Sequence, residues 1–154
     1  MRSLAVFFGL MSIILSAGAL AQNQYEAQLS AKNVCAAIRA EAGDGLFRCD
    51  NLGDETTAIC RGLRAVRTRT GLNTCENLNG IAKAICDGVD TANLSNRLNP
   101  CEYLNGMALE VCRGYGSSTI KSLIDPCEFT RGNSKAVCEG FLAATNPANS
   151  CLEQ

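Results

Sequence analysis

The strongest constraint on this chain is a cysteine repeat. A cysteine, ten residues, a second cysteine, one residue, a glycine and an apolar residue follow one another four times. The first cysteines lie 26 residues apart, and the pairs are Cys49 with Cys60, Cys75 with Cys86, Cys101 with Cys112, and Cys127 with Cys138. A period of this length is typical of repeat units that bury their apolar faces against one another. The pattern predicts repeats that start near residues 47, 73, 99 and 125.

The first 21 residues have the three-part layout of a secretory signal peptide. Arg2 precedes an uncharged apolar run, and Ala19 and Ala21 form a small-residue cleavage site. A membrane anchor, which is the alternative, needs about 20 apolar residues. We therefore predict a signal peptide over residues 1–21 and one disulfide-rich helical repeat domain over residues 22–154. After cleavage no transmembrane segment is expected, so the protein is predicted to be secreted, either to the extracellular space or to the periplasm.

All ten cysteines follow the predicted cleavage site, in a compartment that permits disulfides. We expect five bridges among Cys35, Cys49, Cys60, Cys75, Cys86, Cys101, Cys112, Cys127, Cys138 and Cys151. Disulfides can hold a chain with few large core residues, and here aromatic residues make up only 5%. Thiolate metal sites usually contain CxxC pairs or nearby histidines, and the chain has neither. We therefore expect no metal and no cofactor.

Each repeat also carries signals for the two ends of a helix. In three repeats an Asn or Asp stands two residues before the first cysteine and a glutamate follows that cysteine, as expected for an N-cap and its third helical residue. These pairs are Asn73 with Glu76, Asn99 with Glu102, and Asp125 with Glu128. The glycines after the second cysteines suit left-handed C-caps, and they are Gly62, Gly88, Gly114 and Gly140. The segment from Asn99 to Gly114 is therefore predicted to be one short helix.

A second glycine complicates this interpretation. It recurs five residues after the first cysteine, at Gly80, Gly106 and Gly132, where a helix interior would lose about 1 kcal/mol relative to alanine. Either a neighbouring helix packs closely there, or the Asn-Gly pair is a turn and each unit consists of two helical pieces. We favour the continuous helix.

Helices are also expected outside the repeats. Residues 24–42 contain good helix formers with apolar side chains near helical spacing, and Gly43 would end this helix. The connections between repeats contain fourteen residues, and we predict short linking helices there, for instance after Ser118. The fold class predicted for the whole chain is all-α, with short helices in an antiparallel meander or bundle held by disulfides.

The helix prediction limits how the cysteines can pair. Two residues eleven apart in one helix are about 16.5 Å apart, whereas the Cα atoms of a disulfide lie within about 7 Å. If successive helices run antiparallel, the favoured pattern is Cys35–Cys49, Cys60–Cys75, Cys86–Cys101, Cys112–Cys127 and Cys138–Cys151. The main alternative pairs the two cysteines of each repeat, adds Cys35–Cys151, and requires a break at Asn-Gly. A solenoid bridged between equivalent positions comes third.

Candidate chemistry is limited by the absence of histidine. That absence removes imidazole acid–base catalysis and Ser-His or Cys-His pairs. Catalysis by carboxylates remains, but the recurring glutamates fit a capping role better. The clearest charge feature is a run of four arginines, which could bind an anion: Arg61, Arg64, Arg67 and Arg69. Asn93 matches the N-glycosylation pattern, which matters only in a host that glycosylates.

These observations predict a non-enzymatic function. We expect an exported interaction module, an effector or host-directed factor, that binds a protein or an anionic partner. Removing the signal peptide changes the formal charge from −1 to −2 because it carries one basic residue, so no attraction to nucleic acid is expected. The alternatives are a small secreted hydrolase that uses carboxylates, and a structural protein that assembles through its repeats.

Overall fold

The computed structural model describes residues 27–43, 49–69, 74–94, 100–120, 125–148 and 151. The predicted signal peptide, residues 1–21, lies outside the described residues. The helices are α1 (Ala31–Ala42), α2 (Asp54–Thr68), α3 (Gly80–Asn93), a 3-10 turn η1 (Pro100–Tyr103), α4 (Gly106–Thr119) and α5 (Gly132–Thr145). No strand occurs among these residues. The predicted fold class, short helices in a disulfide-held repeat, is confirmed.

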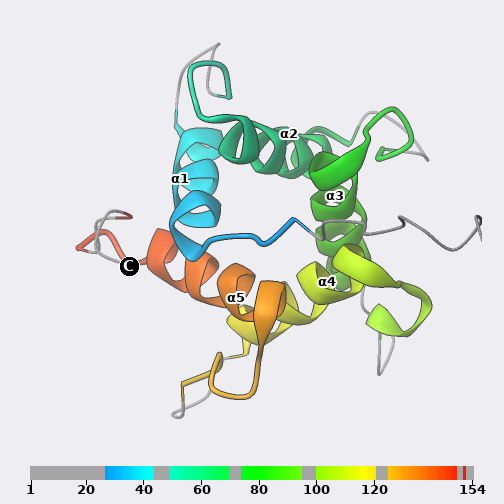
Figure 1. Ribbon diagram of the computed structural model, residues 1–154, viewed down its shortest axis with the longest axis vertical. Helices are drawn as coiled ribbons and strands as arrows, with labels where there is room; N and C mark the ends of the chain where they lie inside the picture. The colour runs from blue at the N-terminus through cyan, green and yellow to red at the C-terminus, as the bar shows by residue number, and fades with distance from the viewer. Residues whose placement is uncertain are drawn as a thin grey trace, which may run out of the picture.

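The five α-helices form a closed ring. Each helix packs against the next one in the chain, and α5 packs against α1. Figure 1 shows them as the sides of a pentagon, with the connecting segments at its outer corners. Because the last helix meets the first, every helix has two helical neighbours.

The disulfides follow the alternative pattern, so the favoured end-to-end pairing is wrong. Four bridges join the two cysteines of one repeat, with Cα atoms 5.6–5.7 Å apart: Cys49–Cys60, Cys75–Cys86, Cys101–Cys112 and Cys127–Cys138. The fifth joins Cys35 to Cys151, and no cysteine is free. Each repeat is therefore closed on itself, and no disulfide joins one of the four repeats to the next.

The pairing within a repeat is possible because the predicted continuous helix is broken at its inner glycine. Gly80, Gly106 and Gly132 have φ angles of +51°, +52° and +54° and begin α3, α4 and α5. This left-handed conformation suits glycine because it has no Cβ. It turns the chain back so that the piece with the first cysteine lies against the helix with the second.

The short piece before the glycine keeps part of the predicted helix start. The Asp125 carboxylate accepts a hydrogen bond from the N–H of Cys127 at 2.9 Å, and the Asp125 carbonyl accepts one from Glu128 at 3.2 Å. In the preceding repeat η1 begins at Pro100, directly after the predicted cap position, but it ends at Tyr103 and not at Gly114. The cap prediction is therefore confirmed for Asp125, where it caps a single turn, and the predicted length of the helix is wrong. The other two predicted caps, Asn73 and Asn99, lie outside the described residues.

The glycines after the second cysteines are not C-caps, which corrects a second prediction. Gly62, Gly88, Gly114 and Gly140 lie inside α2, α3, α4 and α5. A Cβ on Gly88 would lie 2.7 Å from the Ala108 carbonyl oxygen and from the Val111 side chain of α4. Glycine is needed at these positions because the next helix crosses there, backbone against backbone.

A β-branched apolar side chain fills each crossing. The residue before each second cysteine is Ile or Val and is completely or almost completely buried: Val34, Ile59, Ile85, Val111 and Val137. Ile85, Val111 and Val137 lie against Gly62, Gly88 and Gly114 of the preceding helix, and Val34 of α1 lies against Gly140. The same contact, a β-branched side chain against a small residue of the preceding helix, therefore repeats around the ring.

The fifth unit is assembled from both ends of the described chain. In α1 the order Val34, Cys35, Ala36, Ala37 and Ile38 corresponds to Ile59, Cys60, Arg61, Gly62 and Leu63 in α2. Ala37 takes the place of the small crossing residue and is completely buried. In each repeat the first cysteine of the repeat bridges to the second; in this unit Cys151 takes the place of the first cysteine and bridges to Cys35. α1 and Cys151 therefore complete a fifth repeat unit.

The predicted start of the first helix also needs correction. α1 begins at Ala31 and not at residue 24, because the Ser30 side chain caps it by accepting a hydrogen bond from the Asn33 N–H at 3.1 Å. The predicted linking helix after Ser118 falls mainly on residues 121–124, which lie outside the described residues; Ser118 itself lies inside α4, which continues to Thr119. The helices thus run well past the crossing glycines.

Candidate ligand-binding cavity

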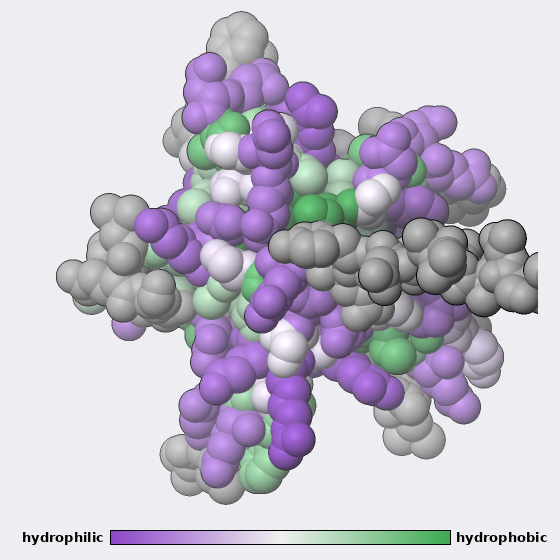
Figure 2. Space-filling model, viewed as in Figure 1, coloured by the Kyte–Doolittle hydropathy of each residue, from purple (hydrophilic) through white to green (hydrophobic). Residues whose placement is uncertain are grey.

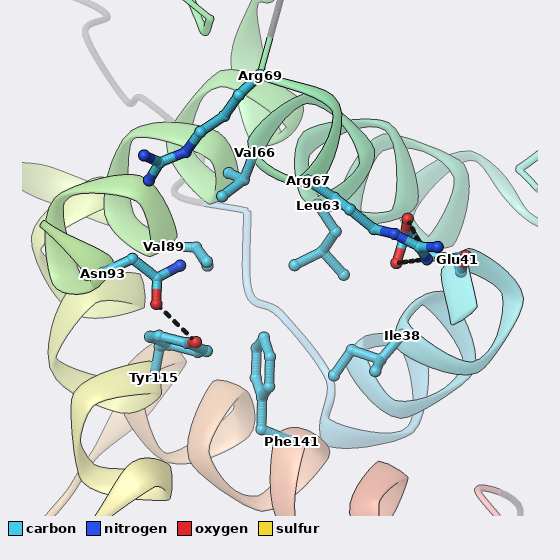
Figure 3. A pocket seen from close by; sticks show the side chains of 10 residues that line it. All are labelled: Ile38, Glu41, Leu63, Val66, Arg67, Arg69, Val89, Asn93, Tyr115 and Phe141. Atoms are coloured by element: carbon cyan, nitrogen blue, oxygen red, sulfur yellow. Dashed lines mark hydrogen bonds and ion pairs between the residues drawn. The ribbon is translucent and has the colours of Figure 1, made fainter.

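A cavity of about 310 Å³ lies at the centre of the ring. All five helices line it, each through the apolar residue that follows its small crossing residue: Ile38, Leu63, Val89, Tyr115 and Phe141. Figure 3 shows these side chains pointing toward one another from the five sides. Val66 adds a further apolar contact from α2. The same position of every unit, directly after the small crossing residue, therefore lines the cavity.

The two aromatic side chains form one wall of the cavity. The ring centroids of Tyr115 and Phe141 lie 4.8 Å apart, and the rings are tilted by 72°. This edge-to-face arrangement is favourable for aromatic pairs. The Tyr115 hydroxyl donates a hydrogen bond to the Asn93 Oδ1 at 2.9 Å, which fixes the orientation of the tyrosine ring at the cavity edge.

The extended segment from Ala27 to Ser30 covers the ring on one side. Leu29 is buried, and its N–H donates a hydrogen bond to Asn133 Oδ1 at 2.7 Å, while the Ser30 N–H donates to Glu55 at 3.2 Å. In Figure 3 the segment passes behind the cavity. Figure 2 shows this covered face from outside, where hydrophilic side chains make up most of the described surface.

The cavity opens on the opposite side of the ring, among residues from the ends of helices. Glu55 and Asn133, which hold the covering segment, belong to the first turns of α2 and α5. The polar residues of the cavity wall instead lie at or just beyond the last turns of α1, α2 and α3, and they are Glu41, Arg67, Arg69 and Asn93. The cavity is therefore apolar inside with a polar mouth.

Two ion pairs cross the mouth from one helix to the next. Arg67 lies 3.1 Å from the Glu41 carboxylate of α1. Arg69 lies 2.6 Å from the Asp90 carboxylate of α3. Both arginine side chains remain about half exposed, at 58% and 47%. Each pair therefore holds its guanidinium group at the mouth while leaving it accessible.

The structure separates the four arginines of the predicted anion site. Arg67 and Arg69 lie at the cavity mouth, whereas Arg61 pairs with Asp50 at 4.0 Å and does not line the cavity. Arg64 is half-buried and does not line it either. The binding of an anion by these residues stays a prediction, and the mouth pair is its best-defined part.

The recurring glutamates are not brought to the cavity. Glu76, Glu102 and Glu128 are exposed and lie on three separate segments, before α3, α4 and α5. None of them lines the cavity. Within the described ranges no group of three or more potential metal ligands comes together either.

The sequence contained a signal for the cavity that was interpreted differently. The apolar residue after each crossing glycine recurs with the repeat, but that glycine was predicted to end a helix. The role of Ile38, and the place of α1 as the fifth unit, were missed because α1 has Ala37 where the other units have glycine. A search for the pattern Cys-x-small-apolar would have found all five lining positions.

Comparison with protein-family models, with curated protein sequences and with solved structures finds no match to this chain. None of the helices in the described part of the chain is long and apolar enough to cross a membrane. Five disulfides without a free cysteine fit an oxidising compartment.

Proposed function

We propose that this protein is an exported, non-enzymatic binding module whose binding site is the central cavity. The observation that carries the proposal is the use of one repeat position, in all five units, to line a single cavity. Its volume of about 310 Å³ lies at the lower end of the range for small-ligand sites. Secretion to the extracellular space or the periplasm is part of the proposal.

The disulfide framework supports a binding role. Each unit is closed by its own bridge, and the Cys35–Cys151 bridge closes the unit that links the two ends of the described chain. A cavity that is already formed before binding costs little ordering of the protein when the ligand enters. A ring of this construction therefore suits ligand capture outside the cell.

The competing hydrolase hypothesis has less support. It needs two carboxylates that face one substrate, and the three recurring glutamates are exposed on separate segments away from the cavity. Glu41 does line the mouth, but it pairs with Arg67.

The proposal is tested with a neutral apolar ligand. Titration calorimetry with 1-octanol should show saturable binding of one molecule per chain. Ile38→Phe should weaken it several-fold, because three more carbon atoms narrow the cavity, and the ring should accept the change because Phe141 occupies the equivalent position in α5. Ala36→Leu, on the same helix but outside the cavity lining, is the matched control and should bind as the natural protein does. Equal binding by Ile38→Phe would contradict the proposal.

A further inference from the structure

We infer that the cavity binds a small amphiphile with a carboxylate head, and that Arg67 and Arg69 hold the carboxylate at the mouth. The inference rests on the proposed function, since it names the ligand class of the same cavity. It follows from three properties of the site: the size of the cavity, the apolar character of its interior, and the hydrogen-bond donors left over at its mouth.

The size of the cavity limits the buried part of the ligand. A cavity of about 150 Å³ accommodates benzene, which has six carbon atoms. The central cavity is about twice as large, at about 310 Å³. Because this cavity is open on one side, the proportion gives an upper limit of roughly ten to twelve buried non-hydrogen atoms, which corresponds to a medium-length alkyl chain or a two-ring group.

The interior favours an apolar body. Its walls are the aliphatic side chains Ile38, Leu63, Val66 and Val89, together with the rings of Tyr115 and Phe141. The polar group nearest to the aromatic wall, the Tyr115 hydroxyl, already donates to Asn93. A polar group buried among these walls would lose its water without gaining a partner, which costs about 1–3 kcal/mol. The head of the ligand therefore belongs at the mouth.

The arginines at the mouth have N–H groups that can still donate hydrogen bonds to a ligand. A guanidinium group has five N–H bonds, and all three hydrogen bonds of the Arg67 side chain come from Nη1, to the carbonyl and carboxylate of Glu41. Its Nε and Nη2 have no partner among the described residues. Within the described ranges Arg69 uses only Nη2, toward Asp90. Two planar donor groups lie at the mouth, two residues apart in the chain, and each is held by a carboxylate of a different neighbouring helix. Such donors match a carboxylate ligand.

The main alternative to a carboxylate head is a cationic head. Glu41 and Asp90 lie at the same mouth as the arginines, and the last turns of α1, α2 and α3 direct the negative ends of their helix dipoles there. A cationic head would use these groups. The carboxylate is favoured because both acids are already paired and are less exposed, at 15% and 26%, than the arginines.

The test compares three ligands with the same eight-carbon chain: octanoate, 1-octanol and octylammonium. On the oxidised full chain at low salt, octanoate should bind about tenfold more tightly than octanol, as one added charge-assisted interaction of about 1.4 kcal/mol predicts. Octylammonium should bind more weakly than octanol. Raising the salt concentration should weaken octanoate binding and leave octanol binding unchanged.

Two arginine variants complete the test. Arg67→Gln and Arg69→Gln together should bring octanoate binding to within about twofold of octanol binding, whereas Arg61→Gln, on the same helix away from the cavity, should leave the preference intact. The salt dependence of the natural protein decides the question if the double variant does not fold. Equal binding of all three ligands, or a preference for octylammonium, would overturn the carboxylate inference while the proposed function stands. No binding of any ligand would overturn both.

Discussion

Gly140 of α5 and Val34 of α1 lie so close that a Cβ on Gly140 would be 2.5 Å from the Cβ of Val34. The two residues are far apart in the sequence, and their contact is where the ring closes. The same relationship joins Gly88 to Val111 and Gly114 to Val137 within the row of repeats. Ring closure therefore uses the same packing as every other junction.

The first prediction concerns these crossings. Gly88→Ala should lower the free energy of unfolding by about 1–3 kcal/mol, because the added methyl group meets backbone and a branched side chain and the core is overpacked. Urea unfolding followed by circular dichroism measures the change. Gly116→Ala is the matched control: Gly116 lies in α4 with no neighbour within 4 Å, so alanine there should raise stability by up to about 1 kcal/mol. A stabilising effect of both substitutions would contradict the close crossing.

The second prediction concerns the glycines that begin the helices. Gly106 has a φ angle of +52° and open space around it. Gly106→Ala should cost about 1–2 kcal/mol from backbone strain alone. Gly106→Asn should cost less, because asparagine tolerates the left-handed region. If alanine and asparagine were equally harmless in urea unfolding, the turn at this glycine would not have the conformation described.

The third prediction compares two disulfides. Replacing Cys35 and Cys151 with serine opens the unit that joins the ends of the ring, which are 116 residues apart. The chain-entropy model gives about 4.7 kcal/mol for a loop of about 100 residues and about 3 kcal/mol for a short loop. The loss should therefore exceed that of the matched pair Cys75→Ser and Cys86→Ser, whose separation is 11. Guanidinium unfolding midpoints measure both, and a larger loss for the short loop would contradict a closed ring.

The fourth prediction concerns Asn133, which is buried at the start of α5. Its side chain accepts a hydrogen bond from Leu29 and donates to the Ala27 carbonyl and to Glu110 at 2.8 Å. Asn133→Ala should cost about 1–3 kcal/mol, because it leaves buried partners unsatisfied. Hydrogen exchange at the Leu29 amide should quicken more than exchange within α3. Unchanged protection of Leu29 would show that the segment is held by other contacts.

The fifth prediction concerns the covalent framework as a whole. The largest fully buried side chains are isoleucine and valine, together with the cysteines themselves, so the apolar interior is small. Full reduction should abolish the cooperative thermal unfolding seen by circular dichroism, because five cross-links no longer constrain the unfolded chain. A melting curve that is the same before and after reduction would show that packing alone stabilises the ring.

Some of the fold followed from local chemistry. The repeat period, the all-α class and the expectation of five disulfides depend on residue types and spacing, which the sequence displays directly. The start of η1 at Pro100 and the turn capped by Asp125 are equally local, because a proline and a capping carboxylate act on adjacent backbone groups.

The tertiary structure decided the rest, and glycine shows why. Gly88 and Gly106 are both glycines, yet they have different roles. Gly88 allows a neighbouring helix to cross, and Gly106 turns the chain at a positive φ angle. The sequence pattern favoured the opposite assignment of these two roles, and the predicted helix length and disulfide pairing were wrong for that reason. A missing side chain permits both close approach and unusual backbone angles, so only the position of the next helix distinguishes them. The cavity could not be predicted for the same reason, because its five lining positions come together only when the helices close into a ring.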